Sequence, residues 1–81
     1  MISNQILKET ISGMKEVTGI DLCILDLSGR IVVTTMEVQE SLTEHATEFA
    51  ESMAESQVID GFQYFKIFDE QRLEYILLVN G

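Results

Sequence analysis

Residues 21–35 read DLCILDLSGRIVVTT, and this stretch decides how the rest of the chain can be arranged. Two runs of apolar and β-branched residues, 21–27 and 30–35, stand on either side of Ser28 and Gly29. A short polar break that contains glycine, placed between two such runs, is typical of a β-hairpin. We therefore expect two antiparallel strands here, with Gly29 at the positive-φ position of the turn.

A helical pattern precedes the hairpin. Ser3 is placed to cap a first helix that runs to about Thr18, and Gly19 is a stop signal. Gly13 interrupts this helix, which indicates a close packing contact. The apolar residues at helical spacing predict one broad stripe that faces the sheet. They are Ile6, Leu7, Ile11, Met14 and Val17.

A second helix is expected after the hairpin. Ser41 and Glu44 have the spacing of a capping box, in which each side chain accepts a backbone N–H of the first turn. One face of this helix is then lined by Leu42, Ala46, Phe49 and Met53.

The remaining residues predict two more strands. Residues 58–68 read as one extended strand, 69–72 as a polar turn and 73–79 as the last strand. The expected order is α-β-β-α-β-β, an α+β fold with helices packed on an antiparallel sheet. With no linker or repeat in the sequence, we expect residues 1–81 to form a single domain.

The first and last strands carry apolar residues on both faces, for example Leu22 beside Cys23 and Leu77 beside Leu78. Such strands need cover on both sides, and two short helices supply only part of it. We expect the rest of the cover to come from a second copy of the chain, or from a segment beyond Gly81. The sequence thus predicts a homodimer and a domain truncated at its C-terminal end.

Charge and composition exclude several classes of function. The net charge is −9, with 14 acidic against 5 basic residues, and the basic residues are scattered singly. Nucleic-acid binding and attachment to an anionic membrane both need a basic patch, so we expect neither. No apolar run is long enough to span a membrane, and residues 1–4 lack the features of a signal peptide. With Cys23 as the lone cysteine, a cytoplasmic location is expected.

No catalytic or metal-binding pattern is visible. His45 is the only histidine, and Glu44 beside it on a helix points elsewhere. Cys23 lies in a predicted central strand, where it is expected to be an inert apolar residue. Metal-ligand spacings and phosphate-binding loops are absent from the sequence. We therefore expect no enzyme activity, no catalytic residue, no metal and no cofactor.

A weaker pattern concerns a small ligand. A cation with hydroxyl groups suits a carboxylate, and such groups would form a pocket if they converge beneath the second helix. The alternative is that they are ordinary strand residues that reach solvent. The candidate ligand-binding residues are Arg30, Thr34, Thr35, Tyr64 and Lys66.

The first helix, the stretch TGIDLCILDLSGRIVVTT and the later SQVIDGFQYFKIFDEQRLEYILLVNG together resemble the N-terminal region of PucR/CdaR-type transcriptional regulators. The resemblance covers nearly the whole chain, and residues 26–30 and 65–75 carry most of it. It implies a PAS-, GAF- or profilin-like domain that senses a small molecule, named as a sugar diacid in this family, and that dimerises. A C-terminal helix-turn-helix beyond Gly81 would then contact DNA.

A second resemblance belongs to another class of function. The order of helices and strands and the Asp26 to Gly29 turn look like roadblock/dynein-light-chain modules. That resemblance implies a dimeric scaffold that binds small GTPases and has no ligand of its own.

Overall fold

The computed structural model describes residues 3–80 and confirms the hairpin from which the fold was derived. Strand β1 (Asp21–Leu25) pairs antiparallel with β2 (Ile31–Thr34). The N–H of Gly29 donates to the carbonyl of Asp26 at 3.1 Å, and Gly29 has a φ of 89°. Residues 1–2, which belong to the stretch 1–4 expected not to be a signal peptide, and the segment expected beyond Gly81 lie outside the described residues.

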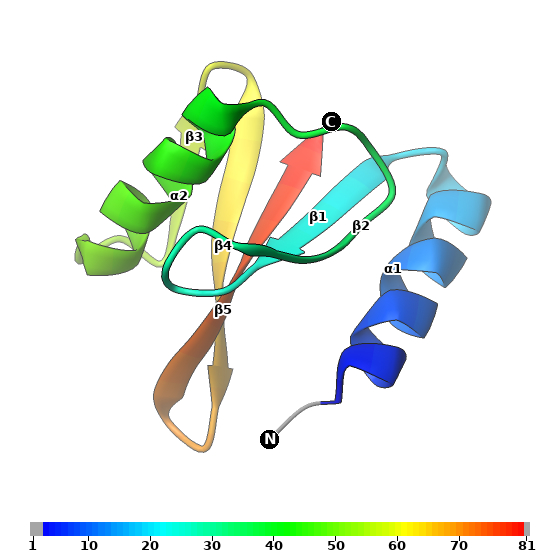
Figure 1. Cartoon of the computed structure of the whole chain (residues 1–81), viewed down its shortest axis with the longest axis horizontal. Helices are drawn as coiled ribbons and strands as arrows, with labels where there is room; N and C mark the ends of the chain where they lie inside the picture. Colours follow the sequence, from blue (N-terminus) through cyan, green and yellow to red (C-terminus); the bar gives the residue numbers. More distant parts are fainter. Residues whose placement is uncertain (1–2, 81) are drawn as a thin grey trace.

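The chain has an α+β fold with a five-stranded antiparallel sheet, whose strand order is β2-β1-β5-β4-β3 (Figure 1). The other elements are α1 (Asn4–Thr18), α2 (Glu40–Glu51), β3 (Ser56–Ile59), β4 (Phe62–Asp69) and β5 (Arg72–Asn80). The doubly apolar strands β1 and β5 are neighbours in the interior of the sheet, as their composition requires.

The prediction of one strand over residues 58–68 is wrong. Asp60 and Gly61 have φ angles of 51° and 83°, so the chain reverses there and forms two paired strands, β3 and β4. Asp-Gly is a preferred sequence for a two-residue hairpin turn, because both positions need a positive φ. The described order is therefore α-β-β-α-β-β-β.

The helix ends agree with the sequence at α1 and differ at α2. The hydroxyl of Ser3 accepts the N–H of Ile6 at 3.2 Å, and Gly19 ends α1 with a φ of 73°. The predicted capping box is wrong, because α2 begins at Glu40, one residue before Ser41. Ser41 therefore lies within the first turn, and the N-cap residue, Gln39, makes no side-chain capping bond.

The two helices cover opposite faces of the sheet unequally. Helix α2 packs over a core formed by Cys23, Leu25, Leu42, Ala46, Phe49, Tyr64, Ile76 and Leu78. Helix α1 packs over a smaller core of Leu7, Ile11, Leu22 and Ile24, against β1 and β2. The β4–β3 half of the α1 face is thus left without a helix. Gly13 does not pack against the sheet, contrary to prediction, since a Cβ there would meet nothing within 4 Å.

Candidate interaction surface

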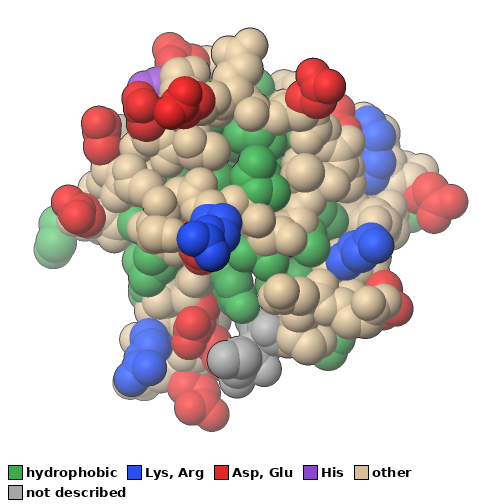
Figure 2. Space-filling view, viewed as in Figure 1, with side chains coloured by type: hydrophobic (Ala, Val, Ile, Leu, Met, Phe, Trp, Pro, Cys, Tyr) green, Lys and Arg blue, Asp and Glu red, His purple; other side chains and the backbone are tan. Residues whose placement is uncertain are grey.

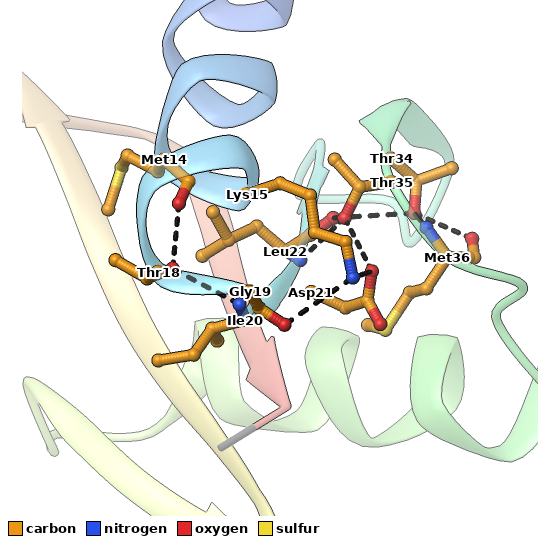
Figure 3. Close-up of polar contacts among 10 residues, drawn as sticks. All are labelled: Met14, Lys15, Thr18, Gly19, Ile20, Asp21, Leu22, Thr34, Thr35 and Met36. Atoms are coloured by element: carbon orange, nitrogen blue, oxygen red, sulfur yellow. Dashed lines mark hydrogen bonds and ion pairs between the residues drawn. The ribbon is translucent and has the colours of Figure 1, made fainter.

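Thr34 and Thr35 belong to a polar network where α1 ends, β1 begins and β2 ends (Figure 3). Lys15 Nζ lies 2.9 Å from Asp21 Oδ1, and the Thr35 hydroxyl donates to the same oxygen at 3.1 Å. The N–H of Leu22 donates to the Thr35 hydroxyl at 2.9 Å. The hydrogen bond from Lys15 holds the pKa of Asp21 below its ordinary value, against the opposing effect of burial. These contacts fasten α1 to the hairpin.

The Thr34 hydroxyl is engaged locally. It donates to the carbonyl of Met36 at 2.8 Å and accepts the N–H of Met36 at 3.1 Å. These two hydrogen bonds fix the conformation of the chain directly after β2, where it turns towards α2.

Arg30 lies at the other end of β2, in the turn of the hairpin. Its N–H donates to Asp26 Oδ1 at 3.0 Å, and the side chain is exposed. Burial opposes ionisation of Asp26, but hydrogen bonds from Ser28 and Arg30 outweigh it and hold the pKa of Asp26 below its usual value. The Asp26 carboxylate therefore holds the turn together through hydrogen bonds from Ser28 and Arg30.

Tyr64 and Lys66 lie on β4 beneath α2, and both hold that helix in place. The buried Tyr64 hydroxyl donates to the carbonyl of Leu42 at 3.2 Å, and burial raises its pKa to about 12. Lys66 Nζ donates to the carbonyl of Ser52 at the C-terminus of α2 and lies 5.1 Å from the centroid of the Phe49 ring. A cation at this end of a helix is favourable, since the backbone carbonyls there carry partial negative charge.

The five predicted ligand residues thus fall in three separate places. Thr34, Cys23, Leu78 and Tyr64 follow one another across the sheet in register. Thr34 and Tyr64 are therefore three strand spacings apart, roughly 14 Å. Arg30 is at the opposite end of β2 from Thr34 and Thr35. Of the five residues, only Tyr64 and Lys66 lie together beneath α2. Both donate a hydrogen bond to a backbone carbonyl of α2 or of its C-cap residue.

His45 and Cys23 are the two residues that were considered for catalysis. His45 Nδ1 lies 3.7 Å from Asp60 Oδ2, which places the histidine against the β3–β4 turn. Burial raises the pKa of the Cys23 thiol, so the thiol is a poor nucleophile.

Among residues 3–80, no group of three or more His, Cys, Asp or Glu side chains could hold a metal ion. In the same part of the chain, neither helix is long and apolar enough to cross a membrane.

A groove lies on the α1 face of the sheet, and we call it the open groove. It has a volume of about 390 Å³ and is lined by Met14, Thr18, Ile20, Leu22, Gln63, Phe65, Leu77 and Val79. A second hollow of about 430 Å³ adjoins it over β3 and shares Gln63 and Phe65. None of these lining residues is charged, so the groove offers nothing to neutralise a carboxylate.

The flank of α1 that borders the groove is apolar too. At about 100° per residue, Met14, Val17 and Ile6 fall on the same side of the buried Ile11, whereas Lys15 falls on the other side. Their exposed fractions are 45% for Met14, 86% for Val17 and 57% for Ile6. The sequence predicted a buried stripe here, and the structure buries only Leu7 and Ile11 of it. Ile6, Met14 and Val17 stay exposed, and of these three Met14 lines the open groove.

Strand β3 forms one edge of the sheet. Its residues, Ser56–Ile59, carry no charge and no proline, and its register with β4 contains no bulge. Exposed edge strands usually contain charged residues, proline or a β-bulge, because these features prevent pairing with another chain. Val58 on this edge is 66% exposed.

No acidic side chain lines the open groove or the hollow beside it. On the face that Figure 2 shows, most acidic side chains lie near the margin and the Lys and Arg side chains are separated from one another.

No family model, no curated protein and no solved structure matches this chain.

The groove residues were not among the predicted site residues. The one signal for them in the sequence was the presence of apolar residues on both faces of β1 and β5, which predicted an uncovered face. The residues that border that face could not be chosen until the position of α1 was known.

Proposed function

We propose that this domain is a homodimeric protein-interaction module that carries out no reaction of its own. One observation carries the proposal: an uncharged, largely apolar surface runs from the α1 flank across the open groove to β3. In a chain with 14 acidic and 5 basic residues, such a surface is typical of a protein-binding site. A receptor for a polar molecule needs convergent polar groups instead.

Of the two resemblances, the roadblock-type scaffold therefore has more support than the sensor of a sugar diacid. Both imply a dimer, but the sensor also needs cations and hydroxyls around one cavity. Thr35, Tyr64 and Lys66 are occupied by contacts that hold α1 and α2 in place. The open groove, which has room for an occupant, has no charged lining residue.

We assign self-association to the β3 edge. Antiparallel pairing of two β3 strands would join two sheets into one and satisfy the outer N–H and C=O groups of both edges. The edge is uncharged, so the contact itself brings no like charges together, although the net charge of −9 on each copy opposes association at long range.

Val58→Lys is expected to weaken the dimer by about tenfold or more, equivalent to about 1.4 kcal/mol. Lysine on an edge strand opposes pairing because two antiparallel β3 strands would bring the two added ammonium groups close together. Val17→Lys on α1 is the matched control, since Val17 is also exposed and the same charge is added. The added charge reduces the net negative charge, so long-range repulsion cannot explain a loss of dimer.

Light scattering over a concentration series measures this effect. The unaltered protein should be a dimer at roughly tens of micromolar, and only Val58→Lys should shift it towards monomer. A monomeric unaltered protein, or equal effects of the two variants, would contradict the edge dimer.

Small dicarboxylates and sugar acids are expected to leave the melting temperature unchanged within about 1 °C, because the predicted ligand residues do not converge. A ligand at a hundred times its Kd adds about 2.7 kcal/mol to stability. For a domain of this size that is a rise of roughly 10 °C or more. A rise of that size, abolished by Arg30→Ala, would restore the sensor interpretation.

A further inference from the structure

We propose that the open groove binds one amphipathic α-helix with lysine or arginine on its flanks, supplied by another protein. The inference names the partner class for one surface of the proposed module and rests on the docking role of that surface. It does not depend on the β3 edge dimer.

The first argument is shape. Helix α1 packs over β1 and β2, while the groove floor comes from β1, β5 and β4. From β1 to β3 the sheet spans three strand spacings, roughly 14 Å. An α-helix with its side chains is about 10–12 Å wide. The space beside α1 therefore fits one helix, and a partner of about 14 residues would match the length of α1 at roughly 21 Å.

The second argument is the lack of hydrogen-bonding groups. Apart from Thr18 and Gln63, the lining of the groove is apolar. The Thr18 hydroxyl already donates to the carbonyl of Met14 at 2.7 Å and accepts the N–H of Ile20 at 3.1 Å. An extended peptide would leave its backbone groups without partners there, at a cost of about 1–3 kcal/mol for each buried group. A helix satisfies its own backbone, so only its apolar side chains need a partner.

The third argument is charge. The groove lining and the neighbouring flank of α1 are uncharged, while the chain as a whole has a net charge of −9. A basic partner is attracted by this field, and an acidic one is repelled. A second copy of the chain does not offer such a helix, because α1 carries Glu9 and Glu16 beside its two lysines and α2 contains no lysine or arginine. The expected partner has apolar residues at i, i+3 or i+4, and i+7, with lysine or arginine beside them.

Three synthetic helical peptides of about 14 residues test the proposal. The first has a leucine stripe with lysine flanks. The second has the same stripe with glutamate flanks, and the third has the composition of the first with the leucines distributed around the helix. Calorimetry should give the first peptide a Kd at least about tenfold lower than the other two. Equal binding of the first and third peptides would overturn the proposal, because charge alone would then explain the affinity.

Met14→Glu and Met53→Glu form the matched pair of variants. Both methionines are exposed, at 45% and 99%, and each substitution adds one negative charge. Met14 lines the groove and Met53 does not. Met14→Glu should weaken binding of the lysine-flanked peptide by about tenfold or more, although its charge favours a basic peptide. Met53→Glu should not weaken it. Equal affinities of the two variants, with circular dichroism showing both folded, would overturn the groove as the site.

The binding site and the dimer can be separated. Amide chemical shifts of Leu22, Phe65 and Leu77 should move on addition of the first peptide, and exclusive movement at β3 would overturn the assignment. If Met14→Glu caused the dimer to dissociate and Val58→Lys did not, a second copy of the chain would occupy the groove and the proposal would be wrong. A monomer that still binds the peptide in the groove would refute only the edge dimer.

Discussion

Phe49→Ala is expected to lower the free energy of unfolding by about 3–5 kcal/mol, the largest effect expected of any substitution named for this chain. Phe49 is 1% exposed and sits at the centre of the α2 core. Its ring centroid is 5.9 Å from that of Tyr64, and it also lies beneath the ammonium group of Lys66. The substitution leaves a cavity and removes both ring contacts at once.

The effect is large relative to the total. A domain of 81 residues has a free energy of unfolding of roughly 4–12 kcal/mol, so Phe49→Ala removes about a quarter of it or more. Urea denaturation followed by circular dichroism measures the change. Phe68→Ala is the matched control, because Phe68 is 52% exposed and should cost under about 1.5 kcal/mol. Similar losses for the two variants would mean that Phe49 is not the centre of the core.

Gly29→Ala is expected to destabilise the domain by about 2–4 kcal/mol, through backbone strain and crowding together. Gly29 has a φ of 89°, which an L-residue rarely adopts. An added Cβ would lie 2.8 Å from the Cγ2 atom of Thr47 and 3.2 Å from the carbonyl oxygen of Thr43. The hairpin turn and α2 could then no longer approach as closely as they do.

Gly61→Ala separates the two causes. Gly61 has a similar φ of 83°, but a Cβ there would meet nothing within 4 Å. Its substitution should cost only the backbone term, about 1–2 kcal/mol. Urea denaturation of both variants should therefore show Gly29→Ala to be the more damaging by about 1 kcal/mol or more. Equal losses would show that α2 yields to the added methyl group.

Local chemistry accounts for the parts of the fold that were predicted correctly. The cap formed by Ser3, the end of α1 at Gly19 and the hairpin turn at Gly29 each depend on residues within a few positions of one another. The Asp60 and Gly61 turn had an equally local signal, the Asp-Gly pair, and it was missed because the apolar residues on both sides read as one continuous strand.

The sheet order explains why the predicted ligand site did not form. Spacing along the chain places Thr34 and Tyr64 in strands, but β1 and β5 were found to lie between their strands. Lys66 could likewise not be assigned to the C-terminus of α2 from sequence, since its partner Ser52 is brought to it only when the helix packs on the sheet.

By itself the sequence determined that the chain is α+β, that 21–35 forms a hairpin, and that β1 and β5 are apolar on both faces. These properties follow from residue type and short-range periodicity. Only the tertiary structure decided which half of the sheet α1 covers, and therefore that Met14 borders a groove while Ile11 is buried. The physical reason is that helical periodicity specifies an apolar face, whereas its burial depends on how much of the sheet lies beneath it.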